Sequence, residues 1–263
     1  MRRSGDVAAA QSADGVDAVH AARATQLAAL ERVVAAGHRL VGFKTALLDP
    51  AAQARLGSPG PVWGWFTDDM QLPDGGVLDL GSRHRFRAEA EIVFVLGHDL
   101  VGPGLTEADV LNATAGIRGG IELPGSRRAD PPATADEFVA DNTSAAHFLL
   151  GRDLVPITNG DRPGNADEQL GRIAELAGSL RCDGEVLASG TAERVLGNPA
   201  RAVAWLANAL AADRLENGGW LAPGALIYVE CPARTGLPPL PPTWTATKAK
   251  QAGEVGYHLL TRA

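Results

Sequence analysis

Two glutamates stand two residues apart at the start of an apolar run. Glu89 and Glu91 occur in RAEAEIVFVLG, where residues 92–96 are Ile-Val-Phe-Val-Leu and Gly97 follows. A run so rich in β-branched and aromatic residues predicts a buried strand. Side chains two apart on a strand share one face at about 6.6 to 7 Å, so the two carboxylates can converge. Burial and mutual repulsion penalise two ionised carboxylates, and a cation between them would relieve that penalty.

A solvated strand edge would also explain this pair, since carboxylates are seldom fully buried. Glu122 adds a third candidate, because it follows Ile121 in another strand-like run, GIRGGIEL. Three carboxylates suit a hard cation such as Mg²⁺ or Mn²⁺, with the open coordination positions left to water or substrate. We therefore expect Glu89, Glu91 and Glu122 to hold a divalent metal ion.

Lys44 is the candidate cation beside these carboxylates. It follows Val41 and Phe43 in RLVGFKTAL, a strand-like segment. A lysine at a strand end is more often a surface residue, and that alternative stays open. If Lys44 lines the same cavity, its ammonium would hold a substrate carboxylate beside the metal.

Several other catalytic signatures are absent from the sequence. It contains no G-x-G-x-x-G, no G-x-S-x-G and no Gly-Lys pair of a P-loop, which argues against dinucleotide, serine-hydrolase and NTPase sites. The six histidines show no paired ligand spacing, and Cys182 and Cys231 are far apart and fit no metal motif. A net charge of -7 gives no reason to expect nucleic-acid binding. We expect a small-molecule partner.

Length and hydropathy bound the organisation of the chain. Its 263 residues allow one large core or two modest domains. No run of about 18 uninterrupted apolar residues occurs, so we expect no membrane span. The first residues lack the apolar segment of a signal peptide, which favours a cytoplasmic protein. Residues 1–16 show no sustained periodicity and are expected to be disordered, leaving 17–263 as a single catalytic domain.

Periodic apolar residues predict three helices. The first spans residues 20–36, where Ala, Leu and Val recur at helical spacing. A short helix from about 107 to 115 follows Thr106, a suitable N-cap residue. A third helix, 198–212, starts with Asn198 as N-cap and a proline at its first position.

Strand-like runs separate these helices. Besides the runs around Lys44, Glu91 and Glu122, Asp183-Gly184 lies between two apolar runs and predicts a β-hairpin. The segment PGPVWGWFTDDM is instead rich in turn residues and aromatics and predicts a loop over a site. No repeat or long linker occurs, which favours one α+β domain with much β structure.

Seven ordered segments of the chain resemble the hydratase/decarboxylase family related to fumarylacetoacetate hydrolase. This family includes 2-hydroxypenta-2,4-dienoate hydratase and 4-oxalocrotonate decarboxylase of aromatic meta-cleavage pathways. The resemblance runs from about residue 19 to residue 230. The segments that carry it are VGFKTAL, WGWFTDDM, RAEAEIVFVLG, GIELPGSR, VADNTSA, FLLG and DGEVLASGTAERVLGNPARAVAWLANALA.

The resemblance implies a mixed β-roll with flanking helices and a helical N-terminal segment. The family's members are commonly homo-oligomers, and a pathway enzyme that receives the product is a further candidate partner. Carried over position by position, the metal ligands fall on Glu89, Glu91 and Glu122 and the active-site lysine on Lys44. The substrate contacts that we expect are Lys44, Trp63, Ser126 and Arg127.

Two positions depart from the family pattern. Hydratases typically show Pro-Asp-Tyr-Gly where this chain reads PVWG, so Val62 replaces a carboxylate that assists proton transfer. Gly125 stands where the family usually has a second Asp. The decarboxylase branch is similar to the WG and TDDM segments of this chain.

The resemblance implies a divalent-metal-dependent lyase that acts on a small unsaturated 2-oxo acid by stabilising its enolate. We rank an activity like that of 4-oxalocrotonate decarboxylase first, because loss of CO₂ from a vinylogous β-keto acid needs no strong base. Hydration of 2-hydroxypenta-2,4-dienoate ranks second, since it requires proton transfers that Val62 does not support. A repurposed biosynthetic or non-catalytic relative that binds a 2-oxo acid is the third alternative.

Overall fold

A six-stranded sheet is the centre of the molecule. The computed structural model describes residues 13–78, 87–128, 130–157, 165–182, 185–213, 221–230, 244–252 and 255–262. The order of the strands in the sheet is β2-β1-β8-β3-β4-β5, and of its neighbouring pairs only β1 and β8 run parallel. The six strands are β1 (Leu40–Ala46), β2 (Val62–Thr67), β3 (Glu89–Leu96), β4 (Thr114–Leu123), β5 (His147–Leu150) and β8 (Leu226–Glu230).

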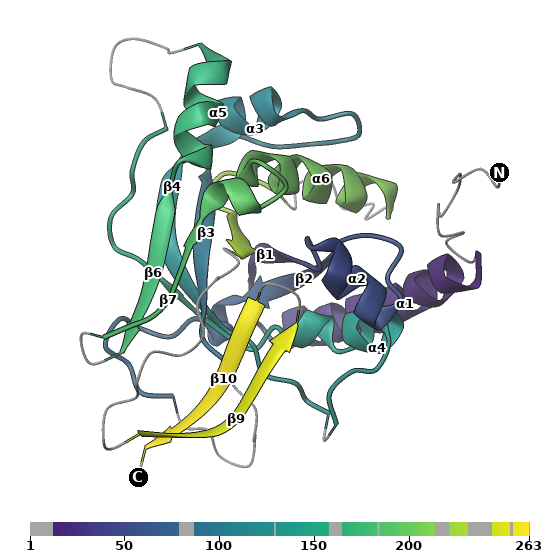
Figure 1. Cartoon of the computed structure of the whole chain (residues 1–263). Helices are drawn as coiled ribbons and strands as arrows, with labels where there is room; N and C mark the ends of the chain where they lie inside the picture. The colour runs from purple at the N-terminus through teal and green to yellow at the C-terminus, as the bar shows by residue number, and fades with distance from the viewer. Residues whose placement is uncertain are drawn as a thin grey trace, which may run out of the picture.

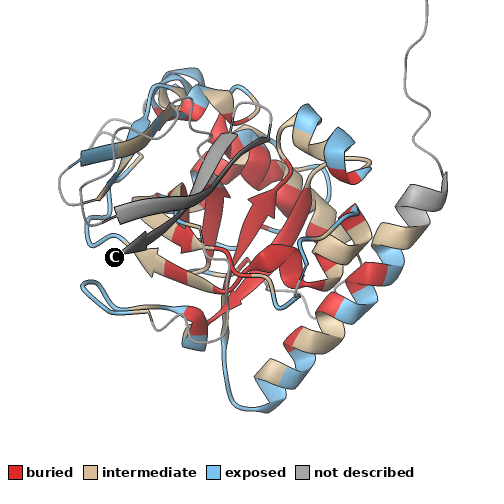
Figure 2. Ribbon diagram, turned by 60° about the horizontal axis from the view of Figure 1, so that its bottom comes forward, coloured by how far each residue is buried: buried red, intermediate tan, exposed pale blue. Residues whose placement is uncertain are grey.

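Helices and two hairpins surround this sheet, and Figure 2 shows its strands as the most buried part of the fold. The hairpins are β6 (Ala177–Cys182) with β7 (Glu185–Thr191) and β9 (Trp244–Ala252) with β10 (Val255–Arg262). The α-helices are α1 (Ala13–Ala35), α2 (Pro50–Leu56), α3 (Glu107–Ala113), α4 (Ala135–Ala140), α5 (Ala166–Ala174) and α6 (Pro199–Ala212). Three short 3₁₀ turns are η1 (Asp68–Met70), η2 (Asn142–Ser144) and η3 (Ala192–Arg194).

The helices divide into two groups. In Figure 1, α3 and α6 lie at one end of the sheet, whereas α1 and α4 pack together at the other. Local sequence explains where α3 and α6 begin. Thr106 and Asp109 form a capping box at the start of α3, and the Asn198 side chain accepts a hydrogen bond from Ala200 N–H at the start of α6. No helix in the described part of the chain has the length and apolar character that crossing a membrane requires.

The sheet curls until its two outer strands meet. Strands β2 and β5 stand at opposite ends of the strand order, yet the N–H of Leu72, which follows β2 and η1, donates to the Phe148 carbonyl on β5 at 2.9 Å. The rings of Phe66 on β2 and Phe148 are also only 4.8 Å apart. The sheet therefore has an inner face, and side chains from non-neighbouring strands can touch across it.

Cross-strand register decides which side chains share this inner face. Lys44 on β1 lies beside Tyr228 on β8, and Tyr228 lies opposite Val93 on β3. Side chains alternate along a strand and directly paired residues point to the same face. Glu91 and Glu89 lie two and four positions before Val93. Their side chains are therefore on the same face of the sheet as Lys44.

The structure confirms most of the predicted elements and corrects one. The helices after Thr106 and Asn198, the strands around Lys44 and Glu91, and the hairpin arms on either side of 183–184 are all present, whereas residues 183–184 themselves lie outside the described part. The segment PGPVWGWFTDDM was predicted as a loop, which is wrong: it contains β2, paired with β1 and buried along its whole length. Gly64 and the aromatic residues serve close packing, since a Cβ on Gly64 would clash with Thr143 Oγ1.

Two boundaries also differ from the prediction. Helix α1 begins at Ala13 rather than near residue 20. Of the segment 1–16, for which disorder was predicted, residues 1–12 lie outside the described part of the chain. The sequence does not predict helices α2, α4 and α5, because each has only six to nine residues and is too short for a clear apolar periodicity.

Candidate metal centre

Three glutamate side chains converge on the inner face of the sheet. Glu89 and Glu91 come from β3, and Glu122 on β4 lies directly opposite Glu89. One carboxylate oxygen from each of the three lies within 4.8 Å of the others. Glu122 is 1% exposed and Glu91 is 5% exposed. The predicted convergence is therefore present, and two of its three carboxylates are buried.

Lys44 reaches the same point from another strand. Its Nζ lies 2.5 Å from Glu122 Oε2, and both side chains are buried. Strands β1 and β4 are separated by β8 and β3 in the strand order, a distance of about 14 Å in a flat sheet. Only the curl of the sheet lets this ion pair form. We call Lys44 and the three glutamates the acidic centre.

The charges of the acidic centre depend on one another. Burial raises the pKa of Glu122 to about 7, although the Lys44 ammonium opposes that rise. Burial by itself would lower the pKa of Lys44, but Glu122, Glu89 and Glu91 together outweigh it and raise the pKa. Lys44 is thus held in its charged form, whereas Glu122 gives up its proton reluctantly.

The donor set fits a hard divalent cation. Three carboxylates against one ammonium leave the acidic centre with an excess of negative charge, and all of its candidate ligand atoms are oxygens. Among the described residues, none donates a hydrogen bond to the buried Oε1 of Glu122. A buried carboxylate oxygen without a donor is costly unless a cation contacts it.

An arginine that was not predicted lies at the outer end of the acidic centre. The Nε of Arg87 is 3.2 Å from Glu89 Oε1, and the side chain of Arg87 is 37% exposed. Its backbone N–H donates to the Pro124 carbonyl at 3.4 Å. The antiparallel pairing of β3 with β4 therefore extends beyond the Glu89–Glu122 pair to Arg87 and Pro124. The sequence signal was its position two residues before Glu89, which places both on one face of a strand.

Aromatic side chains close the inner end. The rings of Phe66, Phe148 and Tyr228 contact one another, with centroids 4.8 to 5.3 Å apart. The Tyr228 hydroxyl donates to the Leu149 carbonyl at 3.1 Å. A Cβ on Gly120 would lie 2.8 Å from Tyr228 Cε1, so glycine is required for β4 to pass this ring. Burial, together with Glu91 and Glu122, raises the pKa of Tyr228 and keeps its hydroxyl neutral.

Val62 brings an apolar side chain to the same side of the sheet. It lies two residues from Gly64, which is opposite Lys44, so the three positions share one face. Val62 is 2% exposed and belongs to an apolar cluster with Leu56 and Val139. No acid or base stands at this position.

The structure does not bring Trp63 to the acidic centre. Trp63 lies opposite Thr45, the neighbour of Lys44, and therefore projects from the other face of the sheet. Its indole N–H donates to Asp213 Oδ2 at 3.1 Å, and the Arg23 guanidinium lies 3.7 Å from the ring centroid. Trp63 thus packs between α1 and the end of α6, and its predicted substrate contact is corrected to a structural one.

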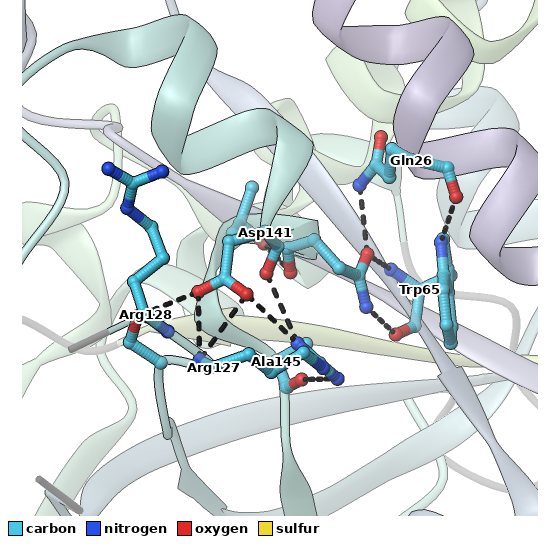
Figure 3. Close-up of polar contacts among 9 residues, drawn as sticks. Gln26, Trp65, Arg127, Arg128, Asp141 and Ala145 are labelled. Atoms are coloured by element: carbon cyan, nitrogen blue, oxygen red, sulfur yellow. Dashed lines mark hydrogen bonds and ion pairs between the residues drawn. The ribbon is translucent and has the colours of Figure 1, made fainter.

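Ser126 and Arg127 bind the segment before β5. Ser126 Oγ donates to Asp141 Oδ2 at 2.8 Å, and the Arg127 guanidinium donates to the carbonyls of Asp141 and Ala145 at 3.3 and 2.9 Å. Figure 3 shows Arg127 facing Asp141 and Ala145. In the described part of the chain, no hydrogen bond or ion pair joins either residue to the acidic centre. They fix the loop after β4 rather than contact the glutamates.

A second buried polar group lies along the outer strand β2. Asn142 Nδ2 donates to the Trp65 carbonyl at 2.9 Å, and Asn142 Oδ1 accepts from Trp65 N–H at 3.0 Å. Gln26 Nε2 donates to Asn142 Oδ1 at 2.8 Å and to the Trp63 carbonyl at 2.9 Å; Figure 3 shows Gln26 beside Trp65. We call Gln26, Trp63, Trp65 and Asn142 the edge cluster, because it replaces the missing neighbour of an edge strand.

One other group of possible metal ligands lies on the surface. His38, Asp68 and Asp69 bring ligand atoms together near η1. Asp68 already accepts hydrogen bonds from the backbone and side chain of Arg39. The candidate ligand residues of this surface group are largely exposed, so the acidic centre is the stronger candidate for a metal site.

Comparison with known proteins gives relatives in two enzyme groups. The chain is 37% identical over 183 residues to 2-hydroxypent-2,4-dienoate hydratase of Pseudomonas putida, an alignment that covers 69% of this chain and 77% of that protein. It is 34% identical to 4-oxalocrotonate decarboxylase of Pseudomonas sp. strain CF600, over 74% of this chain and 69% of the relative. No model of a protein family matches the chain.

A solved structure shares the fold. The structure of 4-oxalocrotonate decarboxylase from Pseudomonas putida G7, complexed with magnesium and adipate, superposes with a TM-score of 0.69 and 30% sequence identity. The superposition covers 84% of this chain and 78% of that one. The predicted α+β fold with a curled mixed sheet is confirmed by this match.

Proposed function

This chain belongs to the hydratase/decarboxylase family of the fumarylacetoacetate hydrolase superfamily, and we propose that it is a decarboxylase of small unsaturated 2-oxo acids. Its class is a metal-dependent lyase. The proposed substrate resembles 4-oxalocrotonate, and the proposed cofactor is Mg²⁺ or Mn²⁺. The observation that carries this proposal is the convergence of Glu89, Glu91 and Glu122 beside Lys44.

The three glutamates would hold the divalent ion through their carboxylate oxygens. When bound, such an ion supplies Lewis-acid polarisation of the 2-oxo group of the substrate. The remaining contributions come from the chain itself. Glu122 and Glu89 are fixed opposite each other by the pairing of β3 with β4, so their oxygens are pre-positioned by the sheet.

Lys44 would bind the substrate carboxylate next to the 2-oxo group. Its ammonium is buried and charged, and it lies at the acidic centre rather than on the surface. A buried ammonium that contacts a carboxylate in place of water orients the bound acid strongly. Phe66, Phe148 and Tyr228 close the inner end, which keeps bulk water away from the reacting carbons.

Val62 favours decarboxylation over hydration. Loss of CO₂ moves electrons along the conjugated chain to the polarised oxygen and needs no proton donor in that step. Hydration requires a group that moves protons, and the buried Val62 offers none beside Lys44. Hydration remains the second candidate, because the relatives include a hydratase at 37% identity.

An assay with two substrates tests this proposal. Purified protein with Mg²⁺ is incubated with 4-oxalocrotonate and, separately, with 2-hydroxypenta-2,4-dienoate, while ultraviolet absorbance and CO₂ release are followed. CO₂ from the first substrate supports the decarboxylase, and turnover of the second substrate alone supports the hydratase. Binding without turnover of either would overturn both and support a non-catalytic 2-oxo acid binder.

A variant tests the metal ligands. Glu91→Gln keeps the shape of the side chain but removes its charge, and we expect it to abolish metal-dependent turnover. Unchanged rates in this variant would exclude the proposed metal site.

A further inference from the structure

Two cationic side chains contact the acidic centre from opposite ends. Lys44 is attached at the level of Tyr228 and Val93, deeper along β3 than the glutamates, and its Nζ meets Glu122. Arg87 precedes Glu89 by two residues and meets it from the outer end. The acidic centre therefore lies between a buried ammonium and a partly exposed guanidinium.

The two cations differ in accessibility. The side chain of Lys44 is 5% exposed, whereas that of Arg87 is 37% exposed. Arg87 is therefore the more accessible of the two cations to a ligand that arrives from solvent. A molecule with a carboxylate at each end would pair one with each cation, while its middle lies over the glutamates.

Arg87 changes the charge balance of the acidic centre. With a divalent ion bound, the three glutamates and Lys44 would sum to zero, and Arg87 raises the sum to one positive charge. A guanidinium presents several N–H donors in a planar fork that matches a carboxylate. Arg87 therefore adds both the charge and the geometry that a second carboxylate requires.

Three other arginines have their partners away from the acidic centre. Arg127 binds Asp141 and Ala145, Arg128 pairs with Glu137, and Arg23 lies against Trp63 on the other face of the sheet. Among the ion pairs of the described residues, that of Arg87 alone links an arginine to a glutamate of the acidic centre.

We propose that Arg87 binds the distal carboxylate of the substrate and thereby selects dicarboxylates over monocarboxylates. This inference rests on the proposed function and specifies its substrate class. Arg87 is then a specificity-determining residue at the outer end, with Lys44 holding the other carboxylate. Its contact with Glu89 keeps the guanidinium beside the acidic centre before the ligand arrives.

A binding experiment tests this role without turnover. Isothermal titration calorimetry measures the affinity of the Mn²⁺-loaded protein for adipate and for hexanoate, which have the same chain length but two carboxylates and one. We expect the wild-type protein to prefer adipate by about 10- to 100-fold, the range of one charge-assisted hydrogen-bonded contact. Arg87→Met should remove most of this preference, weakening adipate while changing hexanoate and Mn²⁺ affinity by less than about threefold. Arg87→Lys should keep part of it, because the charge remains.

Arg128→Met is the matched control. The side chain of Arg128 is 42% exposed and also pairs with a glutamate, but away from the acidic centre. It should leave the preference for adipate intact.

A wild-type protein that binds Mn²⁺ without preferring adipate, or an Arg87→Met variant that keeps the preference, would overturn the role of Arg87. So would a variant that weakens Mn²⁺ and both acids alike, which would mark Arg87 as a positioning residue for Glu89. Absence of Mn²⁺ binding by the wild-type protein would instead overturn the proposed function itself.

Discussion

The acidic centre and the edge cluster are both buried and polar, but their atoms are bonded to different degrees. In the edge cluster, the Asn142 amide makes three hydrogen bonds, and the Gln26 amide nitrogen donates to two acceptors. In the acidic centre, burial raises the pKa of Glu122 to about 7, and no described residue donates to its Oε1. A satisfied buried network stabilises a fold, whereas buried carboxylates without enough donors destabilise it until a cation arrives.

This difference distinguishes a buried polar group that stabilises the fold from one that serves function in the same sheet. The edge cluster holds the edge of β2, and the acidic centre lies on the inner face that the closed sheet creates. A protein keeps an unfavourable buried group chiefly where function needs it. Changes to the two groups should therefore have opposite consequences for stability and for metal binding.

The largest effect is expected for Glu122→Gln. The amide keeps the size of the side chain but removes a ligand charge, so Mn²⁺ affinity should fall by about 100-fold or more, and turnover by about 1,000-fold, which corresponds to several kcal/mol. The free energy of unfolding of the metal-free protein should change little, because loss of the Lys44–Glu122 ion pair offsets the removal of a reluctantly charged buried group. Calorimetric titration measures the Mn²⁺ affinity, and chemical denaturation measures the free energy of unfolding.

Glu137→Gln is the control for this variant. Glu137 accepts hydrogen bonds from Arg128 and Ala133 at the surface and should leave metal affinity unchanged. A Glu122→Gln variant that is strongly destabilised but still binds Mn²⁺ would show that the acidic centre is a structural cluster like the edge cluster.

A pH dependence of the metal effect is expected next. The folded-state pKa of Glu122 is about 7 against 4.5 for the free side chain, so between these values the folded state binds more protons than the unfolded state. Stability of the metal-free protein should therefore fall as pH rises from about 4.5 to 7, by on the order of 3 kcal/mol. Because the cation competes with the proton on Glu122, the rise in Tm on adding Mg²⁺ should be larger at pH 8 than at pH 5.

Glu122→Gln should flatten this pH dependence, which provides the control. Lys44 acts outside this window, because its raised pKa affects stability only in strongly alkaline solution. Equal Mg²⁺-induced shifts in Tm at both pH values would contradict the raised pKa of Glu122.

Asn142→Ala should destabilise the protein without affecting the metal. Three hydrogen bonds are lost, and Asn142, Thr143 and Ser144 all have positive φ angles of 51 to 59°. Asparagine tolerates this left-handed conformation better than alanine. We expect a loss of about 2 to 4 kcal/mol in the free energy of unfolding, with Mn²⁺ affinity within about threefold of wild type.

Asn142→Gly separates the two causes. Glycine accepts the positive φ but lacks the amide, so it should be less destabilising than alanine by about 1 kcal/mol. An equal loss in the two variants would show that backbone conformation contributes nothing measurable at this position.

The parts of this molecule that sequence predicts are those governed by local pattern. The strand of Glu89 and Glu91 follows from a β-branched apolar run, and the start of α3 follows from the spacing of Thr106 and Asp109. The proposed ligand set needed only one strand and its antiparallel neighbour, in which Glu122 lies opposite Glu89. Short-range spacing therefore nominates Glu89 and Glu91, whereas Glu122 is added by its own strand-like run and by the family resemblance.

The remaining features depend on contacts between distant segments. Lys44 reaches Glu122 only because the sheet curls, and no local pattern reports that curl. The turn residues around β2 predict a loop, whereas the edge of this strand is bonded by Asn142, a residue 77 positions away from Trp65. Arg87 was missed although its spacing from Glu89 was visible, since its role depends on the Pro124 contact that extends the strand pairing.

Trp63→Phe should give the smallest effect and tests on which face this residue acts. The variant keeps an aromatic ring under Arg23 but loses the hydrogen bond to Asp213 and leaves a small cavity at a fully buried position, so the free energy of unfolding should fall by about 1 to 2 kcal/mol. Because Trp63 projects away from Lys44, kcat and KM should stay within about twofold of wild type, in contrast to any change in the acidic centre. A rise in KM with unchanged stability would instead place the indole against the substrate and would require the face assigned by the β1–β2 register to be wrong.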